Sequence, residues 1–494
     1  MKHLITKTGL ALALGLGLML ILLLGLGKVE GGGVGARPRV VLAAPGHLFV
    51  TTDGTGTACT QGAPCTLQTA LSQATTGETI YVAQGTYTGT GSAVVTVTNS
   101  ITLYGGWDGA PTGEILRDPG TYPTTFDGEN QRRVVYINGR IAPTLDGFII
   151  TGGDATNAST DALRGGGIYS NHAGPLVTNN VITDNVACRA NTRCRGGGIY
   201  LVDASASTVV SDNLIISNTA NTIGTGQGGG LYLGWSRAVR IRNNTFQSNV
   251  VGTISNSMGG GMYLISSPAL VSGNLIQYNV ATPDGTGFGG GLYTEDSSIT
   301  FDGNTVISNT SGHGALAFAR GTHLTATNNI IAQNVGGVFV RGNATYPFAA
   351  ALSHNTIADN GDGGIVGWWY TNYATLILTN NIIVSHTNGI DFEEDDTSAV
   401  TATYTLFYGN DTDVNGDAIT STHEITGSAP RFVDPEGWNY HVLPGSPAID
   451  AGVTVPWLTT DIDGEIRPND LGYDIGADEA WWSMIYLPLT MRNS

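Results

Sequence analysis

Apolar and polar residues alternate along much of the chain, but only over short stretches. In Ile168–Ser170, Ile199–Leu201 and Leu231–Leu233 the first and third positions are mostly apolar, and Gly or Asn residues interrupt the alternation. Alternation of period two is typical of a β-strand with one buried face, whereas an amphipathic helix would keep a period of 3.6 over about ten residues or more. The pattern therefore predicts short strands separated by tight turns.

Two motifs repeat in register and set the period of these strands. The motif Asn-x-apolar-x-x-Asn begins at Asn180, Asn213, Asn244, Asn274, Asn304, Asn329, Asn355 and Asn381. The motif Gly-Gly-Gly-[Ile/Leu/Met]-Tyr lies at 165–169, 196–200, 228–232, 259–263 and 289–293. A repeat of about 25 residues holds three short strands and three turns. We therefore predict an all-β fold, a single-stranded right-handed parallel β-helix solenoid with three strands per coil.

Both motifs have a structural explanation in such a solenoid. Equivalent Asn side chains on successive coils, about 4.8 Å apart, can hydrogen-bond as a ladder, and Asn tolerates the left-handed backbone of a turn. His386 takes the closing Asn position of the last copy. Gly suits a turn with positive φ or a close approach between coils. Five Gly runs at constant register, each followed by an apolar residue and none by Lys, favour a turn over a phosphate-binding loop.

The early repeats are longer than the later ones. The additional residues lie between the closing Asn and the next Gly run, at 186–195, 219–227, 250–258 and 280–288. Because all four insertions leave the coil at the same corner, we expect them to stack along one edge of the solenoid. Solenoids commonly build their binding surfaces on such an edge.

The N-terminal residues differ from the repeats. Lys2 and Lys7 precede an apolar run at 9–27, and Leu42-Ala43-Ala44 offers small residues for cleavage. Residues 1–44 are therefore predicted to be an export signal or, alternatively, a retained membrane anchor.

The remaining chain divides into four regions. A solenoid end must be covered, so we expect 45–79 to form an N-terminal cap with a short helix in Thr66–Ala74. The β-helix is expected at 80–410, a C-terminal module at 411–480 and a tail at 481–494.

Cysteine spacing and charge restrict the partners. Two disulfides, Cys59–Cys65 and Cys188–Cys194, are expected in an exported protein, since each pair is six residues apart. With a net charge of −18, the chain should not bind nucleic acid, and binding an acidic sugar would need Ca²⁺ or a local Arg patch. We expect a monomer that meets a membrane only through its N-terminal segment or an unidentified C-terminal anchor.

Several segments resemble known families. The Gly-run and Asn motifs, as in Phe246-Gln247-Ser248-Asn249, resemble the repeat of polymorphic outer-membrane proteins and, more broadly, the pectin-lyase-like β-helix superfamily over about residues 45–410. The segments Pro444–Gly452, Asp461–Pro468 and Tyr473–Glu479 resemble the module of choice-of-anchor Q proteins. These resemblances imply bacterial secretion and an extracellular or cell-surface location. Residues 481–494 lack a Leu-Pro-x-Thr-Gly sorting signal, so the anchor is not identified.

A row of tyrosines and a cluster of arginines are candidates for ligand binding. The Tyr of each Gly-run motif has inward-facing neighbours, so it should face outward and stack beside the insertions as a platform for sugar faces, unless the insertions cover it. These residues are Tyr169, Tyr200, Tyr232, Tyr263 and Tyr293. Arg240 and Arg242, with Arg237, form the basic cluster of the coils and could supply the base of a lyase.

Three further segments could support catalysis or bind a metal. Gly312-His313-Gly314 resembles a polygalacturonase signature, but the paired aspartates and Arg-Ile-Lys of that family are missing and the triplet lies in the Gly-run register. The acidic run 391–396 could hold Ca²⁺, provide a glycosidase pair or simply be solvated turn charge. Asp461, Asp463 and Glu465 resemble part of a Ca²⁺ loop, or belong to an ion-paired cap around Arg467.

These observations leave three functions open. The first is a secreted or cell-surface protein that binds carbohydrate or another surface ligand, as an adhesin does. The second is a polysaccharide lyase or glycoside hydrolase of the pectin-lyase-like superfamily, so enzymatic activity is undecided. The third is a structural surface stalk. No cofactor is certain, and Ca²⁺ is the ion to consider.

Overall fold

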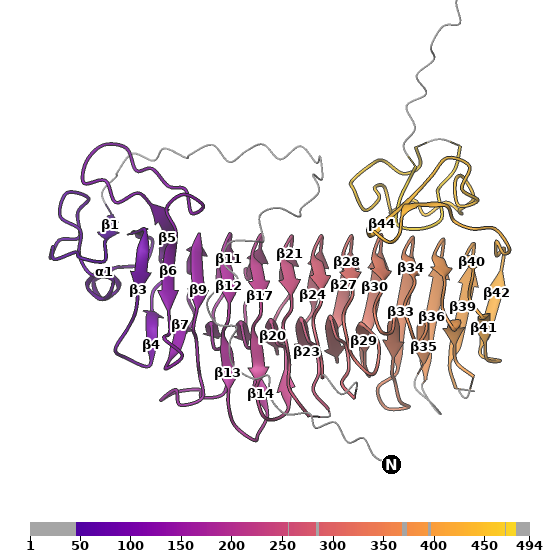
Figure 1. Ribbon diagram of the computed structural model, residues 1–494, viewed down its shortest axis with the longest axis horizontal. Coiled ribbons are helices and arrows are strands. Elements are labelled where there is room, and N and C mark those ends of the chain that lie inside the picture. The colour runs from indigo at the N-terminus through magenta and orange to yellow at the C-terminus, as the bar shows by residue number, and fades with distance from the viewer. Residues whose placement is uncertain are drawn as a thin grey trace, which may run out of the picture. The chain divides into compact units, whose positions relative to one another are not determined.

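Successive turns of the chain add strands to three parallel sheets (Figure 1). A computed structural model describes residues 46–254, 256–282, 286–367, 373–393, 397–469 and 471–480. The expected export signal at 1–44, the tail at 481–494 and residues 394–396 of the acidic run lie outside these described residues. Within them, no helix is long and apolar enough to span a membrane.

Sheet 1 contains 14 strands. They are β1 (His47–Val50), β2 (Thr79–Ala83), β5 (Thr102–Trp107), β8 (Thr144–Asp146), β11 (Leu176–Thr178), β16 (Val209–Ser211), β21 (Val239–Arg242), β24 (Ala269–Ser272), β27 (Ser298–Asp302), β30 (His323–Thr327), β33 (Phe348–Ser353), β36 (Ala374–Thr379), β39 (Ala399–Thr403) and β42 (Ile419–Thr422). The last strand extends the stack past residue 410, where the Asn motif ends.

Sheets 2 and 3 contain 12 strands each. Sheet 2 is formed by β4 (Ala93–Val97), β7 (Arg133–Asn138), β10 (Ile168–Asn171), β15 (Ile199–Val202), β20 (Leu231–Gly234), β23 (Met262–Ile265), β26 (Leu292–Glu295), β29 (Leu316–Phe318), β32 (Val338–Val340), β35 (Ile365–Gly367), β38 (Asn388–Asp391) and β41 (Thr412–Asn415). Sheet 3 is formed by β3 (Gly85–Tyr87), β6 (Thr124–Asp127), β9 (Phe148–Thr151), β12 (Val181–Thr183), β17 (Leu214–Ile216), β22 (Thr245–Gln247), β25 (Leu275–Gln277), β28 (Thr305–Ile307), β31 (Ile330–Ala332), β34 (Thr356–Ala358), β37 (Ile382–Val384) and β40 (Leu406–Tyr408).

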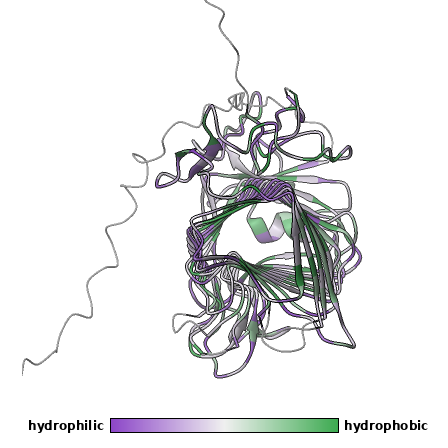
Figure 2. Ribbon diagram, turned by 90° about the vertical axis from the view of Figure 1, so that its right-hand side faces the viewer, coloured by the Kyte–Doolittle hydropathy of each residue, from purple (hydrophilic) through white to green (hydrophobic). Residues whose placement is uncertain are grey.

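Parallel pairing aligns equivalent residues of successive coils into columns. In sheet 2, Ile168 pairs with Ile199, and Ile199 pairs with Leu231. All three side chains are fully buried and belong to one core cluster. Figure 2 shows the coils stacked around a common interior. The predicted right-handed parallel β-helix, with three strands per coil, is confirmed.

The predicted Asn ladders are confirmed. Asn180 Nδ2 donates a hydrogen bond to Asn213 Oδ1 over 3.1 Å, and equivalent bonds continue coil by coil to Asn381. A second ladder of the same kind runs from Asn185 to Asn360. Each amide also donates to a backbone carbonyl, as Asn213 does to Val177 over 2.9 Å. The ladders thus satisfy amide groups that lie in the protein interior.

Two further positions of each coil are restricted by the turns: the residue before the ladder Asn and the Gly run. The left-handed backbone falls on the residue before the ladder Asn, as at Asn179 with φ 54°, and not on the ladder Asn itself. Gly196 opens its Gly run with φ 64°, and a Cβ on Gly197 would lie 2.5 Å from the carbonyl carbon of Thr219 on the next coil. The Gly runs are therefore structural turns, as expected.

The insertions stack on one edge, as expected, and both predicted disulfides are present. The first two insertions pair through β13 (Val186–Cys188) with β18 (Thr219–Asn221) and β14 (Cys194–Arg195) with β19 (Gly226–Gln227). Cys188–Cys194 closes the first insertion and Cys59–Cys65 closes a loop near the N-terminal end, with Cα–Cα distances of 5.9 and 4.6 Å.

Different segments cover the first coil and the outer face of sheet 3. The helix α1 (Leu67–Gln73) begins after Thr66, whose hydroxyl accepts a hydrogen bond from Thr69 N, and its Leu67 joins the core. Residues 423–480, here called the C-terminal cover, include the antiparallel pair β43 (Phe432–Asp434) and β44 (Asn439–Val442).

The C-terminal cover packs on sheet 3 by apolar contact and by hydrogen bonds. Tyr440 and Ile475 share a buried cluster with Ile330 and Ile382 of sheet 3. The Tyr440 hydroxyl donates a hydrogen bond to Asp359 Oδ2 over 2.9 Å. The sheet 3 face is therefore closed over these coils, whereas other faces remain available for a site.

Candidate functional site

The tyrosines of the Gly-run motif form a continuous stack on the outer face of sheet 2. Neighbouring ring centroids lie 4.9–5.3 Å apart, and neighbouring ring planes differ by 5–14°. The members of this tyrosine stack are Tyr136, Tyr169, Tyr200, Tyr232, Tyr263 and Tyr293. The predicted outward direction and stacking of these side chains are confirmed, and Tyr136 adds one further ring.

The expected exposure of these rings is wrong. The five tyrosines predicted to bind sugar retain only 1–6% exposure. The residue before each Gly run pairs with its equivalents on neighbouring coils, and the resulting column lies beside the stack. The column consists of Arg164, Arg195, Gln227, Met258, Phe288 and His313. The Arg195 guanidinium carbon is 5.6 Å from the Tyr232 ring centre. Ring faces that stack on each other and are covered at their edges cannot form a sugar platform.

The phenol groups also have protein partners. Tyr263 and Tyr293 donate hydrogen bonds to Glu295 over 2.8 and 3.3 Å, and Tyr136 donates to Asp161 over 3.3 Å. Burial, followed by the nearby Glu295 charge, raises the pKa of Tyr263 and of Tyr293. The tyrosine stack is thus a second, aromatic core outside the bore of the solenoid.

A cleft opens on the coils that follow the last insertion. It has a volume of about 380 Å³, and six of its twelve lining residues are glycines, so few side chains fill it. The column of the tyrosine stack continues here as Ala317, Phe339 and Val366, which are smaller than tyrosine or end before its hydroxyl. We call this the His313 cleft.

Three polar side chains from different coils line the His313 cleft: His313, Asp362 and Asp391. The His313 ring stacks on Phe288 at 4.5 Å, and burial lowers the pKa of His313, so the imidazole is neutral at pH 7 and can accept a proton. Asp391 accepts hydrogen bonds from Asn388 Nδ2 over 2.7 Å and from Asn415 Nδ2 over 3.1 Å, which fixes its carboxylate. The arrangement can bind a polar ligand and supply a base.

A second depression, of about 700 Å³, lies where the chain leaves the strands of sheet 2. Successive coils contribute a left-handed residue at this corner, His172, Asp203 and Trp235, with φ between 49° and 55°. Trp235 is 49% exposed, and Arg140 and Arg237 also line the depression. We call it the Trp235 groove.

Charges in the Trp235 groove favour an anion. His172 Nδ1 lies 3.6 Å from Asp203 Oδ2. Within the described residues, neither Arg140 nor Arg237 forms an ion pair. Two arginines beside an exposed indole can therefore meet a carboxylate and an apolar face of one ligand.

Arg240 and Arg242 lie elsewhere. Both are exposed on β21, on the outer face of sheet 1, and neither lines the Trp235 groove. Of the predicted arginine cluster, Arg237 lines the Trp235 groove and Arg240 and Arg242 do not.

Comparison with known proteins agrees with the β-helix fold. A family model described as a right-handed β-helix region matches residues 124–306, 227–350 and 291–437, which together span more than half of the 494 residues. The chain belongs to the right-handed β-helix family. No curated protein matches this β-helix protein by sequence.

Several solved structures resemble the β-helix protein. Pectate lyase Pel9A is 14% identical, with 88% of this chain and 96% of that chain covered and a TM-score of 0.38. The A-module of the Azotobacter vinelandii mannuronan C-5 epimerase AlgE6 is 13% identical, with 72% and 91% covered and a TM-score of 0.38. A rhamnogalacturonan lyase is 11% identical, with 85% and 94% covered and a TM-score of 0.33. At these identities the likeness concerns the fold alone.

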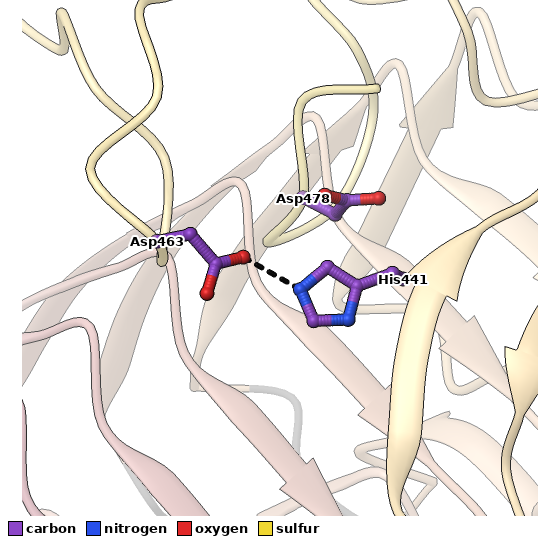
Figure 3. A group of neighbouring side chains, drawn as sticks. All are labelled: His441, Asp463 and Asp478. Carbon is purple, nitrogen blue, oxygen red and sulfur yellow. Dashed lines mark hydrogen bonds and ion pairs between the residues drawn. The ribbon is translucent and has the colours of Figure 1, made fainter. Parts of the chain in front are cut away.

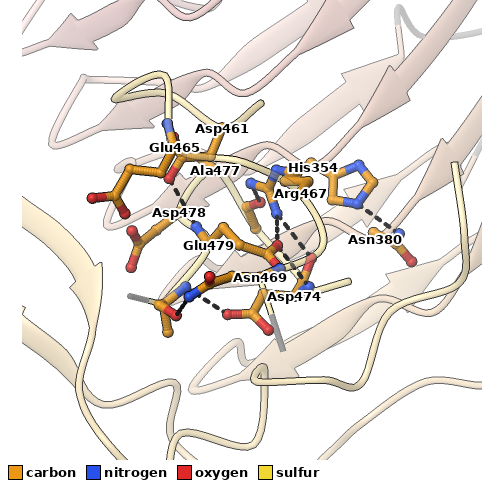
Figure 4. A network of polar contacts seen from close by, with 12 residues as sticks. His354, Asn380, Asp461, Glu465, Arg467, Asn469, Asp474, Ala477, Asp478 and Glu479 are labelled. Carbon is orange, nitrogen blue, oxygen red and sulfur yellow. Dashed lines mark hydrogen bonds and ion pairs between the residues drawn. The ribbon is translucent and has the colours of Figure 1, made fainter. Parts of the chain in front are cut away.

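In the C-terminal cover of the β-helix protein, Arg467 is the centre of a buried network (Figure 4). Its Nη1 lies 2.7 Å from Glu479 Oε2, and both side chains are at most 1% exposed. Glu479 also accepts hydrogen bonds from the backbone N–H groups of Asn469 and Asp474, over 2.9 and 3.0 Å. Arg467 is thus ion-paired, as expected, but within the described chain its partner is Glu479 and none of Asp461, Asp463 and Glu465 pairs with it.

The predicted Ca²⁺ ligands have separate roles in this cover. Asp461 accepts hydrogen bonds from the backbone N–H groups of Asp463, Glu465 and Glu479, over 3.0, 2.8 and 3.0 Å. Asp461 therefore holds the turn. Asp463 instead meets His441, whose Nε2 is 2.6 Å from Asp463 Oδ2. The hydrogen bond that His441 donates to Asp463, opposed by burial, raises the pKa of His441 to about 9.

Sequence reasoning missed Trp235 and Asp362 as site residues. A signal existed for Trp235, because the equivalent residues His172 and Asp203 are polar, so a Trp in their register must be exposed. The sequence could also have predicted that the tyrosine stack is covered, because the residue before each Gly run recurs at constant register and must form a column beside the tyrosines. No local signal predicts that His313 and Asp391 line the same cleft.

Proposed function

We propose that the β-helix protein binds an acidic polysaccharide in the Trp235 groove, outside the cytoplasm. The observation that carries this proposal is the gathering of an exposed indole and two arginines in one groove of a chain whose net charge is −18. The net negative charge of the whole chain favours repulsion of polyanions, so any attraction must come from a local group of cations.

The chemistry of the groove suits a uronate chain. Guanidinium groups of Arg140 and Arg237 can pair with sugar carboxylates through two parallel hydrogen bonds each. The Trp235 ring offers an apolar face to the C–H groups of a sugar ring. Because the lining residues come from successive coils about 4.8 Å apart, an extended polymer can contact several coils at once.

The extracellular part of the proposal rests on other features. The Cys59–Cys65 and Cys188–Cys194 disulfides are typical of an oxidising compartment. The resemblances to choice-of-anchor Q modules and to polymorphic outer-membrane repeats support secretion to a bacterial surface. We infer a surface or secreted binding protein, with its anchor unassigned.

Binding to a polysaccharide panel tests the proposal. Wild-type protein is titrated with polygalacturonate, alginate and a neutral glucan, at low and high salt, with and without Ca²⁺. We expect acidic polymers to bind and the affinity to fall as salt screens the arginines. Trp235→Asn and Arg237→Ala should each weaken binding by about tenfold or more, which is about 1.4 kcal/mol.

Arg240→Ala is the matched control, because this arginine is three residues from Arg237 and outside the groove. It should bind like wild type. Equal loss in Arg237→Ala and Arg240→Ala would assign the effect to general charge, and absence of binding to every polymer would favour the structural stalk.

A second function, polysaccharide cleavage, is favoured by the His313 cleft. His313, Asp362 and Asp391 line it together, and the neutral His313 could remove a proton from a sugar ring or from water. Assays for reducing ends and unsaturated products over the same panel test this idea. Activity that His313→Ala abolishes would establish an enzyme, whereas activity retained in that variant would exclude His313 as the base.

A further inference from the structure

Three potential metal ligands meet in the C-terminal cover, away from the two sites described above (Figure 3). They are His441 of β44, Asp463 of the turn that Asp461 holds, and Asp478, two residues before the end of the described chain. One ligand atom from each residue lies within 4.8 Å of those of the other two. His441 and Asp463 are 38% and 50% exposed, so solvent ions can reach them.

The ring orientation of His441 is fixed by Asn439. The Asn439 side-chain atom 2.6 Å from His441 Nδ1 also accepts a hydrogen bond from the His441 backbone N–H, over 3.2 Å, so it must be the amide oxygen. An amide oxygen only accepts, and therefore Nδ1 carries a hydrogen. This leaves Nε2 as the ligating nitrogen, and Nε2 is the atom that faces Asp463. Metal-binding histidines are commonly held by such a hydrogen bond from their other nitrogen.

The two carboxylates are also positioned before any ion arrives. Asp478 is 7% exposed, and its Oδ2 accepts a hydrogen bond from Val442 N over 2.7 Å. This bond ties Asp478 to the residue after His441. Both oxygens of Asp461 are occupied by backbone N–H groups, so Asp461 positions Asp463 and is not a free ligand.

We propose that His441, Asp463 and Asp478 bind one divalent transition-metal ion of the Zn²⁺ type. On binding, the proton on His441 Nε2 leaves to solvent, and the nitrogen lone pair and one oxygen of each carboxylate coordinate the ion. Imidazole nitrogen suits Zn²⁺, whereas Ca²⁺ takes six to eight oxygen ligands. Three protein ligands leave a coordination position for water. The ion would join β44, the 461–465 turn and the last segment of the cover, and this proposal stands independently of glycan binding.

The experiment uses the full chain without a polyhistidine tag, freed of metal by a chelator. Titration calorimetry with ZnCl₂ should give one site per chain, and Zn²⁺ should raise Tm. Co²⁺ in place of Zn²⁺ should give the visible absorption of a low-coordinate site. His441→Ala and Asp463→Asn should each weaken Zn²⁺ binding by more than about 100-fold. Because both variants also break the His441–Asp463 pair, each is compared with its own metal-free Tm, and Zn²⁺ should raise the Tm of wild type and leave the Tm of each variant unchanged.

Glu465→Gln is the matched control, since Glu465 adjoins the turn but is not in the three-residue set. It should bind Zn²⁺ like wild type. Two results would overturn the proposal. The first is no Zn²⁺ binding by wild type, which would leave His441 and Asp463 as an ion pair only. The second is an ion, Ca²⁺ included, whose binding is lost in Glu465→Gln and kept in His441→Ala, which would assign the site to the acidic turn.

Discussion

The two halves of the solenoid share one kind of core and differ in what lies outside it. On the coils between residues 165 and 293, the covered face is the outer face of sheet 2, where the tyrosine stack lies beside the column that precedes the Gly runs. On the coils between 330 and 406, the covered face is the outer face of sheet 3, where the C-terminal cover packs on Ile330, Ile382 and Leu406. The Asn ladders run through both halves unchanged.

This difference shows that cover, and not residue type, decides which aromatic residue is accessible to a ligand. Tyr232 and Trp235 are three residues apart, yet Tyr232 is 1% exposed and Trp235 is 49% exposed. The His313 cleft likewise begins where the insertions end. Covered columns act as additional core. Ligands can reach side chains only on the faces that these segments leave uncovered.

The largest effect is expected from opening the tyrosine stack. Tyr232→Ala removes a ring packed between Tyr200 and Tyr263, and should lower the free energy of unfolding by about 4 kcal/mol. Glycan binding by the protein that remains folded should not change. Chemical denaturation measures the loss, and Tyr346→Ala, at a residue 51% exposed, is the control expected to stay within about 0.5 kcal/mol. A loss below about 1 kcal/mol would mean that the stack is not a core.

The second cover should depend on its buried ion pair. Arg467→Met leaves Glu479 as a buried charge without its partner, and should cost about 3 kcal/mol. We expect the C-terminal cover to become sensitive to protease before the solenoid does. Arg431→Met is the control, because Arg431 is exposed and donates only to Gly445 O over 3.3 Å. Equal protease sensitivity in both variants would contradict a special role for Arg467.

The sequence predicted the interior far better than the exterior. Period-two alternation and the repeated Asn and Gly motifs report contacts between identical positions on neighbouring coils, so they predicted the strands, the ladders and the direction of the tyrosines. Exposure depends instead on which segment folds over a face. The residues that cover Tyr200 and Tyr232 belong to another part of the repeat. His313 and Asp391 line one cleft only because their coils stack.

The proposed metal ligands show the same division. Asp461 and Asp463 were recognised from local spacing around a Gly turn, but spacing could not tell that backbone N–H groups occupy Asp461. His441 comes from β44, and only the fold of the cover brings it to Asp463.

His386, in the later half, should cause a smaller loss of stability, and this loss should depend on pH. It replaces a ladder Asn: Asn360 Nδ2 contacts its Nε2 at 3.2 Å, and its Nδ1 contacts Asn410 Oδ1 at 3.1 Å. Burial lowers the pKa of His386 from 6.5 to about 4. The unfolded chain therefore binds more protons between these values, so stability is complete above pH 6.5 and falls as the pH drops toward 4, by about 2 kcal/mol at pH 5.

His386→Asn should restore an amide to the ladder and remove this part of the acid sensitivity. Denaturation at pH 7 and pH 5 measures the change, with His323→Asn as the control at an exposed histidine. If the difference between pH 7 and pH 5 is the same in wild type and His386→Asn, then His386 is not the group responsible.

The smallest effect on stability is expected at the exposed aromatic. Residue 235 has a left-handed backbone, which Asn tolerates. Trp235→Asn should therefore change the free energy of unfolding by less than about 1 kcal/mol. Its loss of glycan binding should therefore occur in a fully folded protein. Together with Tyr232→Ala, it makes a crossed test measured by denaturation and polysaccharide titration: one variant loses stability and keeps binding, and the other keeps stability and loses binding. If both variants lose the same property, covered and uncovered aromatic residues do not have separate roles, and the distinction between the two faces fails.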